Sequence, residues 1–393
     1  PVAAPTIRCL FVLLLSLPLP SQAIWLVGYG QQHTLASGAA AASNGDVLLV
    51  QSPPSPWTWL EPGFVLTKGV TIRGPASIQY VYGQGGLPEF RAAVPAGALA
   101  VIERVSFDGA DFGPGGQGPI PVEVDSGTVL FRQCTFRGTV RVRVGAHAVF
   151  EQCTLQAPQD WSAGLRVEGS AELRDCTIVG SDAGCYYDSG FNCMAARAAD
   201  PAITVNGGTL HAERLTARGG AAAIRAGQHQ PAMPAVLVLA GRAWLTASSL
   251  TGGAETTGWP FAPVFPAPAL ENRSAVTIGL DGVTLIPGGS GAPPFVGLVD
   301  LQASHLQLLV PPLARGTSST ATVLGDPNEL VALLWAPDSA PTLHPAVAQP
   351  IWLVTGGVTL GGGVSDASGA WSTSLQIPNV PALQHLRVPL QAV

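Results

Sequence analysis

The sequence predicts an all-β chain built on a parallel β-helix, and three observations lead to that prediction. Charged residues make up only 11% of the 393 residues, whereas glycine and proline together number 82 (47 Gly plus 35 Pro). One six-residue pattern recurs eight times between residues 102 and 306, and short alternating runs of apolar residues precede four of the copies. So little charge argues against a helical bundle, and a repeat of this kind is typical of a solenoid.

The charge balance excludes one class of partner. The formal net charge is -6, and Lys68 is the one lysine among 19 basic residues. Without a basic stripe the chain cannot neutralise a phosphate backbone, so we expect no nucleic-acid partner.

The first 23 residues have the features of a secretory signal peptide. Arg8 supplies a positive charge, residues 9–20 form an apolar run, and Ser21-Gln22-Ala23 places small residues before a cleavage point. A membrane anchor is the alternative, but the run is short and contains two prolines. After residue 23 no apolar stretch reaches about 20 residues, so we expect no membrane span after cleavage. The protein is therefore predicted to be secreted, extracellular or in the cell envelope, and the missing initial Met indicates a fragment.

The six-residue pattern, or hexad, has a fixed form: an apolar residue, two mostly polar residues, a small or apolar residue, Ser or Thr, and an apolar residue. The fourth positions of successive copies lie between 19 residues (Cys134 to Cys153) and 39 residues (Cys176 to Leu215) apart. The shortest interval suffices for one coil of three short strands. The copies are 102–107, 131–136, 150–155, 173–178, 212–217, 245–250, 280–285 and 301–306.

Coils stacked about 4.8 Å apart place equivalent positions of the hexad in columns. We expect the polar pair of each hexad to form a bend between two strands, and positions four and six to point inward. Position five then forms an outward row of hydroxyl groups: Ser106, Thr135, Thr154, Thr177, Thr216, Ser249 and Thr284. The alternating runs at 121–124, 140–144, 164–167 and 202–205 predict strands that precede the hexads.

Residues 34–51 and 66–74, with a Gly45-Asp46 turn between a short Ala-rich helix and the first strands, resemble the opening of secreted proteins of the pectate-lyase-like superfamily. The resemblance implies a right-handed parallel β-helix with an N-terminal cap helix, which we assign to residues 24–312. Such a helix covers the exposed end of the coil.

Residues 313–393 depart from the hexad and contain strand-like runs broken by Pro, Asp and Gly. They predict a small C-terminal β-sandwich-like domain. Because the chain ends inside an apolar run, we expect this domain to be cut short.

The long intervals between hexads contain insertions that all follow a hexad: 108–120, 157–163, 179–201, 219–234 and 252–271. Leaving the coil at one turn, they are expected to form a common flank, although the same pattern would arise if this corner merely tolerated insertions. Their aromatic rings and carboxylates suit a sugar-binding surface, or alternatively pin the loops to the coil. The predicted ligand-binding residues are Tyr186, Tyr187, Trp161, Asp160 and Trp259.

The cysteines fall into two groups. Cys185 and Cys193 lie in the longest insertion, where an oxidising compartment favours a disulfide. The inward column of Cys134, Cys153 and Cys176 suits disulfide geometry badly, so buried free thiols are expected there. No cysteine spacing indicates a metal site.

Three arginines, Arg141, Arg143 and Arg166, face outward by alternation, with Glu123 one coil before Arg143. They form either a charged column on a solvated sheet or a set of contacts for the carboxylates of an acidic polysaccharide.

Enzymes of the family that the chain resembles are expected to carry more acidic residues. Lyases use clustered carboxylates for calcium and a Lys or Arg base, and the related hydrolases use several Asp residues. Here Asp182, Asp188 and Arg174 are the nearest catalytic candidates, and no family motif matches them. We therefore predict a non-catalytic structural or adhesive protein without a cofactor, whose partner is a polysaccharide or cell-surface glycan. The alternative is a polysaccharide lyase or glycoside hydrolase acting on an acidic polysaccharide, and Ca²⁺ is the cofactor expected for such an enzyme.

Overall fold

The computed structural model divides into two compact units, Pro1–Leu301 and Gln302–Val393. The sequence placed the boundary eleven residues later, after residue 312. The structure describes residues 23–28, 30–31, 33–51, 59–61, 63–80, 90–108, 122–157, 163–187, 193–225, 228–255, 266–301, 307–309, 316–324, 328, 330–335, 339–342, 351–353, 358–367, 370–376 and 390–392.

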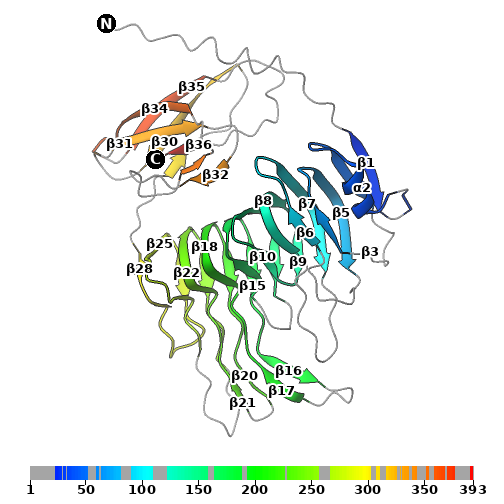
Figure 1. Cartoon of the computed structure of the whole chain (residues 1–393). Coiled ribbons are helices and arrows are strands. Elements are labelled where there is room, and N and C mark those ends of the chain that lie inside the picture. The colour runs from blue at the N-terminus through cyan, green and yellow to red at the C-terminus, as the bar shows by residue number, and fades with distance from the viewer. Residues whose placement is uncertain are drawn as a thin grey trace. The chain divides into compact units, whose positions relative to one another are not determined.

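The first unit is a parallel β-helix (Figure 1). Among the described residues, 24 of its strands join in one parallel assembly with three faces, which we name the lead, middle and hydroxyl sheets. The lead sheet contains β4 (Phe64–Leu66), β6 (Phe90–Ala93), β10 (Val140–Val142), β13 (Leu165–Val167), β24 (Leu270–Asn272) and β27 (Phe295–Val296). The middle sheet contains β1 (Ile24–Gly28), β2 (Val47–Gln51), β11 (Ala146–Glu151), β14 (Ser170–Arg174), β25 (Ile278–Asp281) and β28 (Val299–Asp300).

The hydroxyl sheet contains β3 (Trp59–Glu61), β9 (Thr135–Arg137), β12 (Thr154–Gln156), β15 (Thr177–Val179), β19 (Thr216–Arg218), β23 (Ser249–Thr251) and β26 (Thr284–Ile286). Longer strands pass from one sheet to the next. Those from the lead to the middle sheet are β8 (Val122–Arg132), β18 (Ile203–Glu213) and β22 (Val236–Thr246). Those from the middle to the hydroxyl sheet are β5 (Thr71–Tyr80) and β7 (Leu99–Asp108).

The bend predicted in each hexad lies at the second residue of the polar pair. That residue has a left-handed backbone, with φ between 47° and 58°, in seven successive copies: Arg104, Gln133, Gln152, Asp175, Arg214, Ala247 and Gly282. A left-handed residue between two short strands turns the chain while leaving both strands free to pair with the next coil. The first residue of the polar pair remains in the strand.

The predicted columns are confirmed by the register of the strands. The hydroxyl row runs in unbroken Cα register from Ser106 to Thr284. Ser77 of β5 extends it by one further coil, which the hexad search missed because the register shifts between Arg73 and Ala76.

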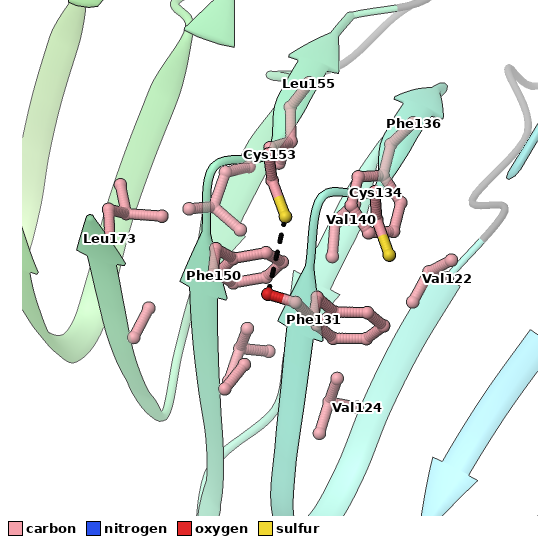
Figure 2. Close-up of a cluster of buried hydrophobic side chains, with 14 of the residues drawn as sticks. Val122, Val124, Phe131, Cys134, Phe136, Val140, Phe150, Cys153, Leu155 and Leu173 are labelled. Carbon is pink, nitrogen blue, oxygen red and sulfur yellow. Dashed lines mark hydrogen bonds between the residues drawn. The ribbon is translucent and has the colours of Figure 1, made fainter. Parts of the chain in front are cut away.

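The core contains a column of stacked phenylalanine rings and a column of cysteine thiols (Figure 2). Phe131 and Phe150 stack with ring centroids 5.1 Å apart and an interplanar angle of 11°. Cys134, Cys153 and Cys176 are buried free thiols, as predicted. Burial raises the pKa of the Cys153 thiol far above its ordinary value.

Each of these thiols donates to a main-chain carbonyl of the preceding coil. Cys153 Sγ lies 3.5 Å from the Phe131 carbonyl oxygen, and the equivalent bonds from Cys134 and Cys176 reach Ile102 and Phe150 at 3.4 and 3.3 Å. In these three coils the cysteine at position four therefore both fills the core and gives a partner to the carbonyl beside the bend.

The predicted cap helix is α2 (Leu35–Ala41), whose N-cap Thr34 accepts a hydrogen bond from the Ser37 backbone N–H. Asp46, in the turn that follows, accepts hydrogen bonds from the backbone N–H groups of Ser43 and Ala23 and from the indole of Trp25. These donors hold the pKa of the Asp46 carboxyl below its usual value. The turn thus ties the first strand to the helix.

The second unit contains antiparallel sheets, as predicted for a sandwich-like domain. One has the order β29 (Gln307–Leu309), β30 (Ser318–Leu324), β35 (Ala370–Gln376), and another has the order β34 (Val358–Val364), β31 (Leu330–Trp335), β36 (Leu390–Ala392). A hairpin joins β32 (Ser339–Thr342) to β33 (Ile351–Leu353). Trp371 packs against buried residues of both three-stranded sheets, including Ala321 and Leu333. Within the described part of either unit, no helix is long and apolar enough to cross a membrane.

Candidate functional site

Insertions that follow the hydroxyl sheet project from one side of the coil. Two of them form antiparallel hairpins, β16 (Gly184–Tyr187) with β17 (Cys193–Arg197) and β20 (Ala223–Arg225) with β21 (Gln228–Gln230). The hairpins come from neighbouring coils and lie side by side (Figure 1). The expected common flank is therefore present at these two insertions.

The flank stands on a stem rich in glycine, alanine and proline, made of residues 180–183, 198–201, 219–222, 231–234, 252–254 and 266–268. Outgoing and returning arms of successive loops alternate in one hydrogen-bonded ladder. Backbone N–H groups donate from Asp200 to Ser181, from Gly220 to Asp200, from Met233 to Gly220 and from Gly253 to Met233, at 2.8 to 3.0 Å. An added Cβ at Gly220 would lie 1.9 Å from the Ser181 carbonyl oxygen. The stem is thus a backbone-to-backbone stack that leaves no room for side chains at its glycines.

The sequence carries a signal for this stem that the hexad search passed over. The three longest insertions open with Gly followed by Ser or Gly (180–181, 219–220, 252–253) and return through Pro-Ala (201–202, 234–235, 268–269).

Of the predicted ligand-binding residues, the structure describes two. Tyr186 and Tyr187 lie in β16, where a register irregularity falls between them. Asp160, Trp161 and Trp259 lie outside the described residues. Their role stays a prediction.

The predicted disulfide also stays a prediction. The hairpin register pairs Cys185 with Ala196 and Cys193 with Tyr187, so neither cysteine stands directly opposite the other.

Two of the catalytic candidates serve structural contacts. Asp182 is exposed, accepts a hydrogen bond from the Ala221 backbone N–H at 2.8 Å and lies 3.8 Å from the Arg218 guanidinium. Arg174 lies in the middle sheet and pairs with Glu172 at 3.1 Å. The third candidate, Asp188, lies outside the described residues.

Arg174 belongs to a row of alternating charges on the outer face of the middle sheet. The row runs through Arg73, Glu103, Arg132, Glu151 and Arg174 in strand register. Glu103 lies 2.8 Å from Arg73 and 2.6 Å from Arg132. Burial raises the pKa of the Glu103 carboxyl, but the two guanidinium groups outweigh it and hold that pKa below the usual value. The row stabilises the stack without offering a carboxylate cluster.

The outward arginines of the lead sheet are mostly engaged. Glu123, 1% exposed, is in register with Arg141 rather than Arg143, and it pairs with both. Arg141 also binds Glu168 at 2.7 Å. Arg166 is exposed and stands directly beside Arg141 on the next strand. Two of the three arginines thus form the charged column, and Arg166 is the one placed to meet an external anion.

A polar cluster that the sequence analysis did not identify lies on the outer face of the middle sheet. It contains Ser170, His147 and Glu172, with His211 and Trp244 on the next coils. His211 and Trp244 stack with ring centroids 4.7 Å apart. The signal was present, since His147 and Ser170 each stand three residues before the first position of a hexad and so had to be neighbours. Among the described residues no three His, Cys, Asp or Glu side chains gather to hold a metal ion.

Comparisons with known proteins give no family for this chain. No family model matches it, and no curated protein matches it. Among solved structures it is similar to the enzymatically active domain of tailspike protein 4 of bacteriophage CBA120, with a TM-score of 0.33 and 10% sequence identity. That match covers 85% of this chain and 60% of the tailspike chain. The β-helix assignment therefore stands on the strand register of this chain.

Proposed function

We propose that this protein is an exported β-helix scaffold that binds a polysaccharide or cell-surface glycan through the flank formed by its insertions. The observation that carries the proposal is the side-by-side packing of the β16–β17 and β20–β21 hairpins on one shared stem. Loops on a rigid scaffold hold binding groups in fixed positions, which reduces the ordering cost of binding. Tyr186 and Tyr187 lie on this flank, and tyrosine rings are suited to pack on the C–H face of a sugar.

Binding, rather than cleavage of glycosidic bonds, is the role that suits this flank. A lyase or glycoside hydrolase would need Asp182 and Arg174 to act on substrate, but both are engaged in contacts that hold the stem and the charge row. A hydrolase of this type also needs a second carboxyl group at a defined distance from the first.

The test is a glycan array probed with the secreted protein and with a triple variant, Tyr186→Ala, Tyr187→Ala and Trp161→Ala. We expect the variant to lose binding at least tenfold, because each ring removed takes away apolar contact area worth about 1 kcal/mol or more. Thr154→Ala, on the hydroxyl sheet, is the matched control and should bind as the wild type does. Equal binding by the triple variant and the wild type would refute the proposal.

A further inference from the structure

The carboxylate of Asp46 is buried beside the point at which the predicted leader ends. Asp46, 5% exposed, lies in the turn between α2 and β2. Its Oδ2 accepts hydrogen bonds from the Ser43 backbone N–H at 2.8 Å and from the Trp25 indole at 3.1 Å. Its Oδ1 accepts a hydrogen bond from the Ala23 backbone N–H at 2.9 Å. Ala23 is the last residue of the predicted leader, so the leader supplies one donor to a buried charge.

Cleavage after Ala23 changes the surroundings of this carboxylate. It removes the Ala23 N–H, and with it the Ala23 carbonyl oxygen that accepts from the Val47 N–H at 2.9 Å. A buried carboxylate that loses a donor is destabilising unless another donor replaces it. The same cleavage supplies a replacement, because the nitrogen of Ile24 turns from a neutral amide into an ammonium group with three N–H donors.

Covalent geometry keeps the new ammonium group close to the carboxylate. The nitrogens of Ala23 and Ile24 are three bonds apart, which sets them roughly 3 Å from each other. Because the Ala23 nitrogen lies 2.9 Å from Asp46 Oδ1, the Ile24 nitrogen lies within about 6 Å of that oxygen. Strand register holds Ile24 in this place, since it pairs with Val47, the residue after Asp46. Opposite charges at such a separation favour the ionised form of both groups.

We propose that Asp46 is the binding site for the α-ammonium group of the processed chain, so that removal of the leader anchors β1 to the turn after α2 through an ion pair. The inference rests on the export that is part of the proposed function. The Ile24 ammonium replaces the Ala23 N–H as the donor to Oδ1, while the donors to Oδ2 stay in place. Processing thus exchanges a neutral donor for a charged one, which makes the stronger hydrogen bond.

Lys68 and His33 are titratable groups near this pair. Lys68 donates through Nζ to main-chain carbonyl oxygens at the C-terminal end of α2. The main-chain hydrogen bonds, foremost that of Ser43, hold the pKa of the Asp46 carboxyl below its usual value, and the charge of Lys68 contributes less. His33 packs edge-on against the Trp25 ring, with centroids 5.6 Å apart. The carboxylate therefore relies on direct donors more than on neighbouring charge, and the leader contributes one of them.

The test measures the titration of the N-terminal amine in the processed chain, whose first residue is confirmed by mass spectrometry. Lys68 is the one lysine, so reductive methylation with isotope-labelled formaldehyde gives a separate NMR signal for each of the two amines. We expect the pKa of the Ile24 ammonium to lie above its value in Asp46→Asn, because the carboxylate favours the charged amine. Asp175→Asn, which removes an exposed carboxylate on a distant coil, is the matched control and should leave the Ile24 signal unchanged.

A second measurement does not depend on the folding of Asp46→Asn. Nα-acetylation of Ile24 removes the charge and leaves Asp46 in place, and urea unfolding compares the acetylated and free chains as the pH is raised. Because the pKa of the amine is raised in the folded state, its stabilising effect is complete below the pKa of the unfolded amine and is lost as pH rises through the folded pKa. We expect the free chain to unfold at higher urea at neutral pH and the difference to disappear at alkaline pH.

An Ile24 amine that titrates alike in the wild type and in Asp46→Asn would overturn the proposal, as would equal stability of the free and acetylated chains at neutral pH. A processed chain that begins at another residue would overturn it as well. A chain that keeps residues 1–23 in a host with a secretion pathway would contradict both this inference and the export on which it rests. The glycan array is read separately, so loss of glycan binding in a chain with the ion pair intact would count against the proposed function alone.

Discussion

Replacing Phe150 by Ala is expected to lower the free energy of unfolding of the β-helix by about 3 to 5 kcal/mol. Phe150 is fully buried, stacks on Phe131 and meets Phe136 edge-on with centroids 6.0 Å apart. Its removal leaves a cavity between coils whose spacing is fixed by backbone hydrogen bonds, so the neighbours cannot close it. Urea unfolding followed by circular dichroism measures the loss.

Thr154→Ala is the matched control for this change. Thr154 lies four residues later on the next face, and its side chain is exposed in the hydroxyl row. We expect its effect to stay within about 0.5 kcal/mol. Equal effects of the two substitutions would mean that Phe150 does not face the core.

Adding a methyl group in the loop stem, by Gly253→Ala, is expected to destabilise the flank by about 3 kcal/mol or more. The new Cβ would lie 1.9 Å from the Gly220 carbonyl oxygen, a backbone atom of the preceding coil that cannot rotate away. The two arms must then separate, which breaks the bond from the Gly253 N–H to the Met233 carbonyl. Amide hydrogen exchange across residues 219–254, with urea unfolding, would measure the loss of protection.

Gly291→Ala is the control for this change, because it replaces a glycine by alanine without placing the new methyl group against another atom. Nothing lies within 4 Å of the Cβ added there, so stability should be unchanged or slightly raised. A Gly253→Ala protein with wild-type exchange rates would contradict the close-packed stem.

The coil was predictable because its physical cause is local and repeated. A hexad with inward residues at positions four and six must stack on its neighbour to bury them, so the register from Ser106 to Thr284 followed from the spacing alone. Ser77 was not found because its coil has one extra residue between Arg73 and Ala76, which breaks the hexad.

The site was less predictable because its members meet across coils rather than along the chain. Alternation indicated that Arg141 and Arg143 face outward, but only the register shows that Glu123 lies opposite Arg141 and binds both. Ser170 and His147 stand at the same distance before their hexads, so only a comparison of successive coils, and not the hexad pattern itself, makes them neighbours. Whether an outward residue becomes buried depends on the neighbours on either side, and hexad composition does not contain that information.

The stacking of coils is tested most directly by electron–electron distances between spin labels on the hydroxyl row. Three double-cysteine variants pair Thr284→Cys with Thr135→Cys, Ser106→Cys or Ser77→Cys, which lie five, six and seven coils away in the register. Labels stacked about 4.8 Å apart per coil give backbone separations of roughly 24, 29 and 34 Å, rising in equal steps. Distances that rise in this way are the result that a parallel β-helix predicts. Distances that follow the unequal sequence separations, or that scatter without a step per coil, would contradict it.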